Sequence, residues 1–272
     1  MDRQLRDTEE HAQGKLRLSR AGGVARIVLN APDKLNAMSL SMWHALGDVC
    51  LALARDQNLR VVTIEGAGDR AFVVGADISE FGETRNSAEA AASYGAAVSR
   101  AEEAITALPV PTIALIRGYC IGGGLEIAMR CDLRLARDDA RFAITPAKLG
   151  LGYGYDGIAL LERRVGHATT ADLLFSGRKM AADEAMAKGI CDHVYQTARY
   201  DEATHAYIKT MAENAPLSIR AIKAALIDLA RPETARNPDH PRKLAQACFD
   251  SADYREGQAA FSEKRPPRFE GR

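Results

Sequence analysis

The chain has 272 residues, in which 36 basic side chains balance 36 acidic ones and 47% of the residues are hydrophobic. Zero net charge argues against a protein drawn to nucleic acid or to an anionic membrane surface, and the length allows one large core. The sequence contains no apolar run long enough to cross a bilayer and no basic, apolar leader, so we expect a cytoplasmic globular protein.

From the amino terminus, the first half of the chain alternates between strand-like and helix-like patterns. Residues 1 to about 13 are polar and are expected to form a loose tail. Apolar alternation on both sides of Gly22 and Gly23 indicates a β-hairpin, and Ser39 is placed to cap the helix that follows. In this half we expect strands at 15–20, 24–29, 61–64, 72–78 and 112–116, and helices at 40–54 and 87–108.

The second half begins with two more strands and a loop rich in glycine and tyrosine, and is then almost wholly helical. The strands are expected at 133–136 and 142–144, and the helices at 158–165, 168–175, 182–188, 200–214, 217–229 and 241–249. Strands interleaved with helices imply an α/β layered core. The helical end is typical of an oligomerisation element.

The cysteines and histidines show no metal-ligand spacing, so we expect no metal site. The five cysteines are scattered and odd in number, which favours reduced thiols packed as small hydrophobic side chains. They are Cys50, Cys120, Cys131, Cys191 and Cys248.

The segment from Leu115 to Asp132 is the most informative for function. Three glycines, 122 to 124, follow a β-branched run and open a predicted helix that carries Glu126 in its first turn. Glycines let a backbone approach a ligand closely, and a helix N-terminus suits an oxygen that gains negative charge. The alternative interpretation is a plain strand-to-helix turn with a glutamate that faces solvent. Asp132 is expected to be structural, holding the glycine loop through backbone hydrogen bonds.

Four motifs in register resemble the crotonase (enoyl-CoA hydratase/isomerase) superfamily, from about Lys15 to the carboxyl end. They are Asp-Lys-Leu-Asn-Ala-Met at 33–38, Gly-Ala-Asp-Ile at 75–78, Gly-Gly-Gly-Leu-Glu at 122–126 with the aspartate at 132, and the tail at 250–265. The resemblance implies an α/β spiral of ββα units packed as two sheets. It also implies a core at 14–199 with an acyl-CoA site, and a helical module at 200–272 that builds homotrimers or dimers of trimers.

The resemblance further implies an acyl-CoA substrate and no separate cofactor, since coenzyme A is part of the substrate. It assigns an oxyanion hole to the backbone N–H groups of Ala76 and Gly123, which could stabilise an enolate by several kcal/mol. The CoA-binding residues would be Lys34, Leu35, Ala37, Ala76, Asp77, Ile78, Gly122, Phe261 and Lys264, the last two from a neighbouring helix or subunit. Lys34 and Lys264 have a competing interpretation as solvated surface lysines.

The sequence departs from the hydratase pattern at one catalytic position. Hydratases of this family activate water with two glutamates, of which the first matches Glu126. The second falls on Pro146 or Ala147, and no acidic residue occurs between Asp139 and Asp156. The usual mechanism with two carboxylates is therefore hard to build from the aligned positions.

The loop at 145–157 instead resembles the methylmalonyl-CoA decarboxylase branch, in which the tyrosine that matches Tyr153 lies beside the reacting carboxylate. Loss of CO₂ needs no base, only a poorly solvated carboxylate and an oxyanion hole, after which Tyr153 or Glu126 protonates Cα. Alternatively, Tyr153 merely packs over the pocket. Asp156 is expected to cap a helix beginning at Gly157, or else it serves as a displaced acid or base.

These observations lead to three hypotheses. The first is an acyl-CoA lyase that acts through a thioester enolate, with decarboxylation of a short malonyl-type CoA as its reaction. The second is an enoyl-CoA hydratase or isomerase with an atypical acid or base. The third, an RNA-binding homologue without catalysis, would need a basic surface stripe, and the balanced charge and absence of basic runs argue against it.

Overall fold

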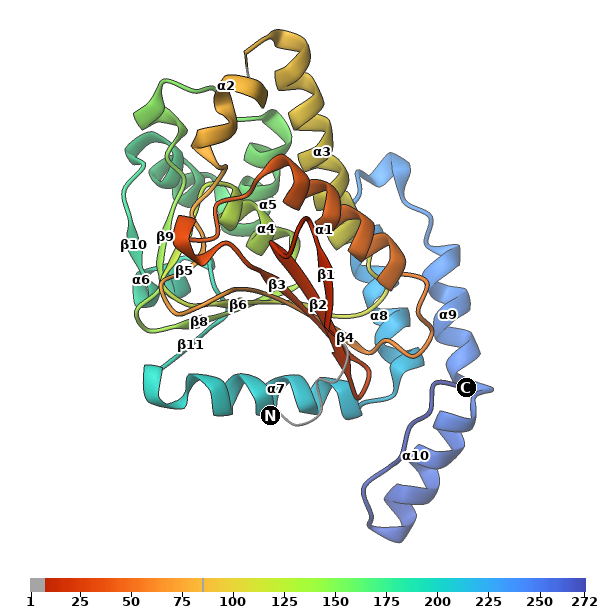
Figure 1. Cartoon of the computed structure of the whole chain (residues 1–272). Coiled ribbons are helices and arrows are strands. Elements are labelled where there is room, and N and C mark those ends of the chain that lie inside the picture. The colour runs from red at the N-terminus through yellow and green to blue at the C-terminus, as the bar shows by residue number, and fades with distance from the viewer. Residues whose placement is uncertain (1–7, 85) are drawn as a thin grey trace.

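The computed structural model describes residues 8–84 and 86–272 and contains two β-sheets with helices packed around them (Figure 1). The larger sheet has seven strands in the order β1-β2-β3-β4-β6-β8-β11, and the smaller has four in the order β10-β9-β7-β5. The bounds of the larger sheet are β1 Thr8–His11, β2 Leu16–Ala21, β3 Val24–Leu29, β4 Val61–Gly66, β6 Thr112–Ile116, β8 Leu133–Arg137 and β11 His193–Tyr195. Those of the smaller are β5 Ala71–Val73, β7 Tyr119–Ile121, β9 Arg141–Ala143 and β10 Met180–Ala181.

The larger sheet is antiparallel over β1, β2 and β3 and parallel from β3 onward. The predicted hairpin is confirmed, because β2 and β3 pair across Gly22 and Gly23. The expected loose tail is wrong for Thr8–His11, which pairs antiparallel with β2. This edge strand is exposed on both faces, so its sequence shows no apolar alternation. Residues 1–7 lie outside the described part of the chain.

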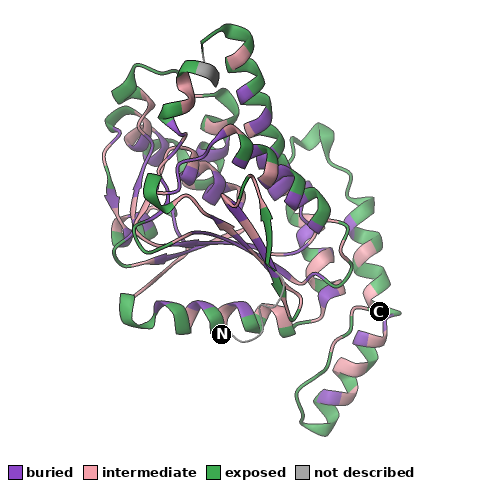
Figure 2. Cartoon of the chain, viewed as in Figure 1, coloured by how far each residue is buried: buried purple, intermediate pink, exposed green. Residues whose placement is uncertain are grey.

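Helices cover both faces of the larger sheet (Figure 1). One face carries α7 (Tyr200–Glu213), and the other faces α1 (Leu40–Leu53), α3 (Ala88–Thr106) and α4 (Gly123–Arg130). Every residue of β4 and β6 is buried between these layers, as is usual for parallel strands covered on both sides (Figure 2). The core therefore lies between the sheet and α1, α3 and α4.

The two long helices of the core begin as the sequence predicts. The Ser39 hydroxyl accepts the Met42 N–H at 3.3 Å at the start of α1, and Ser87 caps α3 in the same way. The predicted strand at 72–78 ends early, at Val73, because the chain turns at Gly75 with φ at 102°. A short helix, α2 (Phe81–Thr84), follows this turn before α3.

The expected start of the helix after the glycine- and tyrosine-rich loop is wrong by two residues. Helix α5 (Tyr155–Ala171) begins at Tyr155 with Gly154 at its N-cap, so Asp156 lies in the first turn and is not the cap. The two helices expected at 158–165 and 168–175 meet at a kink in α5 at Gly166, where φ is 75°, and the second continues beyond α5 as a π-helix at Asp172–Ser176. A glycine tolerates this left-handed conformation, so the chain changes direction without a connecting loop.

The last quarter of the chain extends away from the sheets. After α6 (Ala182–Ala187) and α7 come α8 (Pro216–Leu229), α9 (Asp239–Phe249) and α10 (Ala252–Glu263), and α10 projects from the rest of the molecule (Figure 1). The chain then runs back along α10, and the Ala252 N–H donates to the Arg272 carbonyl at 2.7 Å. The division at residue 200 and the trimeric assembly stay predictions.

The cysteines are all free, and four of the five are buried. Burial, with a contribution from Cys131, raises the pKa of the Cys50 thiol to about 12. Cys248 on α9 is partly exposed. Within residues 8–84 and 86–272, no helix is long and apolar enough to cross a membrane.

Candidate active site

The loops that leave β5 and β7 lie side by side because these two strands are parallel neighbours. A Cβ built on Gly122 would lie 3.6 Å from the Gly75 Cα, and one built on Gly75 would lie 3.9 Å from the Gly123 nitrogen. Both Gly75 and Gly122 have positive φ, at 102° and 56°. The structure thus brings the segment of Ala76 against the segment of Gly123, as the predicted oxyanion hole requires.

The backbone N–H of Ala76 is left available by the hydrogen bonds on either side of it. The Met38 N–H donates to the Gly75 carbonyl at 2.8 Å, and the Asp77 N–H donates to the Met38 carbonyl at 2.9 Å. The Ala76 N–H itself donates to no other described residue. Gly123 is the first residue of α4, where a helical N–H has no acceptor within the helix. Two neighbouring donors therefore remain for an oxygen that gains negative charge.

Gly123 and Gly124 have different neighbours, so a side chain would be excluded at each position for a different reason. A Cβ on Gly124 would lie 2.4 Å from the Val73 carbonyl oxygen, so this glycine lets α4 pack directly on β5. A Cβ on Gly123 would lie 3.4 Å from the Trp43 ring and 3.8 Å from Glu126 Oε2. The Glu126 carboxylate is thus next to the proposed donor at Gly123.

Tyr153 also lies in this buried region. Its hydroxyl is shielded from water and makes no hydrogen bond of good geometry to the residues described, although it lies close enough to Glu126 for that side chain to raise its pKa by hydrogen bonding. Burial, and then the charge of Glu126, raise the pKa of Tyr153 far above its ordinary value. The phenol therefore stays protonated, as a near neighbour of Glu126 that could donate a hydrogen bond to a bound group.

A second carboxyl group, which the sequence analysis missed, belongs to the same cluster. Glu102 on α3 is 7% exposed, and its Oε2 accepts from Arg130 Nη2 at 2.6 Å. Burial first, and then the charge of Glu126, raise the pKa of Glu102 to about 7, although Arg130 opposes the rise. The only sequence signal was a glutamate on the same side of the helix as Ala101 and Ile105, which are buried.

Neither of the two aspartates considered in the sequence analysis, Asp132 and Asp156, is placed as a catalytic group. Asp156 is exposed in the first turn of α5 and is a lesser contributor to the raised pKa of Glu102, after burial and Glu126. Asp132 is structural as predicted, but the expectation that it holds the glycine loop is wrong. Its Oδ2 accepts the Thr112 N–H at 2.8 Å and Lys223 Nζ at 2.5 Å, so it ties β6 to α8.

Some of the residues predicted to bind CoA lie beside Ala76. Lys34 Nζ is 2.6 Å from Asp77 Oδ2 and 2.8 Å from Ser79 Oγ. Although burial acts to raise it, hydrogen bonds from Lys34 and Ser79 bring the pKa of Asp77 below its ordinary value. Ile78 is 66% exposed. Lys34 and Ile78 are thus exposed next to the proposed donor at Ala76, and Asp77 is buried beneath them.

The other predicted CoA contacts are more varied. Leu35 takes a left-handed backbone conformation with φ at 52°, and Ala37 is buried. Phe261, which is 88% exposed, and Lys264 lie at the end of α10, away from α4 in the same chain (Figure 1). Within one chain the structure does not bring these last two residues to Glu126, so their role stays a prediction.

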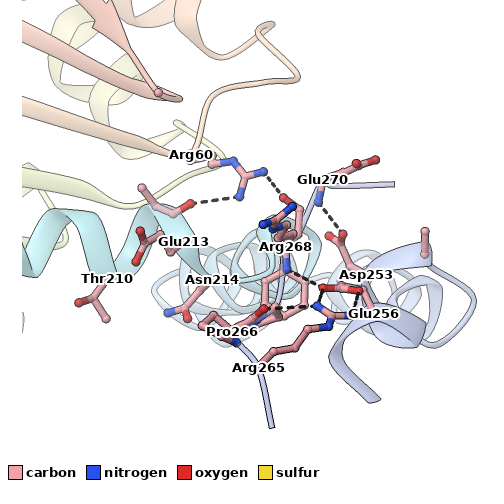
Figure 3. A pocket seen from close by; sticks show the side chains of 15 residues that line it. Arg60, Thr210, Glu213, Asn214, Asp253, Glu256, Arg265, Pro266, Arg268 and Glu270 are labelled. Carbon is pink, nitrogen blue, oxygen red and sulfur yellow. Dashed lines mark hydrogen bonds and ion pairs between the residues drawn. The ribbon is translucent and has the colours of Figure 1, made fainter. Parts of the chain in front are cut away.

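A large cleft of about 1370 Å³ lies elsewhere, between the end of α7 and the tail that returns along α10 (Figure 3). Polar groups of its own walls bond to one another: Arg265 pairs with Glu256 at 2.6 Å, and the Arg60 guanidinium donates to the Phe269 carbonyl at 2.5 Å. None of the predicted site residues lines it. These contacts dock the tail, so we place the candidate site at Glu126. In the described part of the chain, no group of three or more His, Cys, Asp or Glu residues could hold a metal.

The chain is similar to known proteins along almost its whole length. A family model described as Enoyl-CoA hydratase/isomerase matches residues 19–272. A short-chain-enoyl-CoA hydratase of Clostridium acetobutylicum is 30% identical over 248 residues, covering 91% of this chain and 94% of that protein. A carnitinyl-CoA dehydratase of Proteus mirabilis is 32% identical over 266 residues, covering 94% of this chain and 98% of that protein.

Among solved structures, an enoyl-CoA hydratase/carnithine racemase from Magnetospirillum magneticum is similar with a TM-score of 0.92 and 35% identity, covering 99% of both chains. This similarity confirms the expected α/β fold with two sheets and carboxyl-terminal helices. The names of these relatives support the superfamily but not specifically its decarboxylase branch. The chain belongs to the enoyl-CoA hydratase/isomerase family.

Proposed function

We propose that the protein is a hydro-lyase that adds water to the double bond of an enoyl-CoA thioester, or removes it in the reverse direction. The observation that carries this proposal is the position of the Glu126 carboxylate. Its Oε2 lies 3.8 Å from a Cβ position on Gly123, next to the available N–H groups of Ala76 and Gly123. The hydratase and dehydratase names of the relatives support the same reaction class.

In this reaction the thioester oxygen would accept hydrogen bonds from the N–H groups of Ala76 and Gly123. Water adds at Cβ, the electrons of the double bond move onto the thioester oxygen, and a proton is then delivered to Cα. Glu126 accepts the proton of the attacking water and returns one to Cα, so the carboxylate is restored at the end of the cycle. The two backbone donors stabilise the enolate charge while it exists.

A second candidate is decarboxylation of a short malonyl-type CoA, which Tyr153 favours. Its buried hydroxyl is protonated and close to Glu126, and the position of a second catalytic glutamate carries Pro146 or Ala147. Here the bond between Cα and the carboxylate breaks, CO₂ leaves, and its electron pair forms an enolate held by the same two N–H groups. A proton from Tyr153, replaced from water, would complete the product.

The two candidates are separated by incubating the protein with crotonyl-CoA and, in a second reaction, with methylmalonyl-CoA, followed by mass spectrometry. Gain of one water by crotonyl-CoA, lost in Glu126→Gln and kept in the control Glu103→Gln, is the expected result. Glu103 suits this control because it is an exposed glutamate beside Glu102 on α3. Loss of CO₂ from methylmalonyl-CoA, with crotonyl-CoA unchanged, would replace the proposal with the decarboxylase.

A further inference from the structure

We infer that Glu102 is a positioning residue of this active site, which acts through Glu126 by holding the one proton that the two carboxyl groups share. The inference rests on the proposed function. It concerns a residue on α3, outside the glycine segment and outside the aligned position of the second glutamate.

The geometry brings together three charged groups, of which Glu102 is buried and Glu126 and Arg130 are half-buried. Glu126 and Arg130 are four residues apart on α4, so their side chains leave the same face of that helix. Glu102 reaches this face from α3, with its Oε2 at 2.6 Å from Arg130 Nη2. The Glu102 side chain is 10% exposed and that of Arg130 is 17% exposed, so water screens the cluster poorly.

Charge balance explains which protonation state this cluster favours. With both glutamates ionised, one guanidinium faces two carboxylates, and the buried group carries a net negative charge. One proton makes the cluster neutral, which removes the repulsion between the carboxylates and the cost of burying an excess charge. Burial, and then the charge of Glu126, raise the pKa of Glu102 to about 7, so within this inference we assign the shared proton to Glu102.

Among the described residues, Arg130 is the one positive group that acts strongly on Glu102. Tyr153 is protonated and neutral, and Asp156 adds a further negative charge from the start of α5. Helix α1, which packs along α3, contributes Asp48 to a pair with Arg100 at 2.6 Å. Helix α2 contacts α3 near the start of that helix, and Glu102 is near its end.

The shared proton has a consequence for catalysis. While Glu102 is neutral, Glu126 can be the ionised partner and accept the proton of the attacking water. When Glu102 ionises, the site holds a second negative charge next to Glu126. That charge repels the negative charge that develops on the substrate enolate, and Arg130 alone does not neutralise both carboxylates. The singly protonated pair is therefore the active form, and the rate should follow the protonated fraction of Glu102.

The test is the pH dependence of enoyl-CoA hydration in the wild type, Glu102→Gln and Glu103→Gln. A single ionisation near pH 7 lowers the wild-type rate about tenfold between pH 6 and pH 8. Glu103→Gln should keep this decline, whereas Glu102→Gln, whose amide does not ionise, should abolish it. Arg130→Gln should move the decline to higher pH because Arg130 lowers the pKa of Glu102. A decline that is unchanged in Glu102→Gln overturns the inference.

A measurement without substrate separates this inference from the proposed function. Infrared difference spectra of the free protein should show a protonated carboxyl band that disappears around pH 7 and is absent in Glu102→Gln. Glu126→Gln should shift the midpoint of that band to lower pH, because the neighbouring charge is gone. A midpoint unmoved in Glu126→Gln rejects the coupling. If the coupling is present but no enoyl-CoA is hydrated, the proposed function fails instead.

Discussion

The Trp43 indole N–H donates a hydrogen bond to the Tyr94 hydroxyl at 2.9 Å, and both side chains are buried. This bond joins α1 to α3, and the Trp43 ring lies 3.4 Å from a Cβ position on Gly123. The Trp43 ring therefore packs against the proposed oxyanion donor at Gly123. Helix α3, which carries Tyr94, also carries Glu102.

Replacing Trp43 by Phe should lower the free energy of unfolding by about 2 kcal/mol, of which about 1 comes from the lost hydrogen bond and the rest from the smaller ring. Urea unfolding followed by far-ultraviolet circular dichroism checks this, because Trp43 is the only tryptophan and its fluorescence disappears with it. The companion variant Tyr94→Phe should cost about 1 kcal/mol. Equal stability of all three proteins would contradict the packing described.

Replacing Gly124 by Ala should lower the free energy of unfolding by at least about 1–3 kcal/mol, since the new Cβ would lie 2.4 Å from the Val73 carbonyl oxygen. Gly95→Ala is the matched control. Gly95 is inside α3 with nothing within 4 Å of a Cβ, so its replacement should stabilise the helix by about 0.5–1 kcal/mol. Thermal unfolding of both variants should therefore shift in opposite directions.

Replacing Lys223 by Met should cost about 3 kcal/mol, the low end for a broken buried ion pair. Lys223 is 5% exposed and contacts both carboxylate oxygens of Asp132, at 2.6 and 2.5 Å. The loss stays at the low end because Asp132 keeps the Thr112 N–H. Chemical denaturation measures the effect, and Lys209→Met, at an exposed ion pair of α7, should change stability by less than about 1 kcal/mol.

The pKa of Glu102, raised by burial and by Glu126 from 4.5 to about 7, also predicts how stability depends on pH. Between these values the folded state binds more protons at Glu102 than the unfolded state, so the contribution of Glu102 to stability is fully present below about pH 4.5 and is lost as pH rises through 7. At about 1.4 kcal/mol per pKa unit, this group should contribute a loss of about 2–3 kcal/mol between pH 5 and pH 8.

Unfolding in urea at pH 5 and at pH 8 checks this expectation. The wild type and Glu103→Gln should show the loss, and Glu102→Gln should lack it because its side chain does not titrate. A stability difference between the two pH values that is the same in all three proteins would assign the pH dependence to other groups.

Replacing Glu126 by Gln should lower kcat for the proposed hydration by about 10²–10⁴, the usual range for loss of a general acid or base. KM should change little, since the amide keeps the size of the side chain. Steady-state kinetics on crotonyl-CoA measures both constants. A kcat within a factor of two of the wild type would remove Glu126 from the chemistry.

Sequence patterns predict those parts of the fold that depend on local interactions. Ser39 could be assigned as an N-cap because a cap bonds an N–H only a few residues along the chain, and the hairpin at Gly22 and Gly23 has a local turn. The strand at Thr8–His11 was missed because an edge strand exposed on both faces needs no apolar alternation. The sequence alone could not place it, since its partner strand provides its hydrogen bonds.

The candidate site divides in the same way. The glycine segment and Glu126 are recognisable because they are contiguous in the sequence and match a family motif. Glu102 could not be found there, because its environment depends on α4 and on Tyr153, which lie far along the chain. Apart from its helical spacing from the apolar Ile105, Glu102 has the same sequence signature as a solvated glutamate in an alanine-rich helix.

The uneven burial of the cysteines has a practical consequence. Buried thiols with a raised pKa, such as Cys50, react slowly with alkylating reagents, whereas Cys248 is partly exposed on α9. The folded chain should therefore accept one fluorophore or spin label at Cys248 under mild conditions, and all five thiols should react once it is unfolded. Helix α9 thus carries a natural attachment point for distance measurements, without any engineered residue.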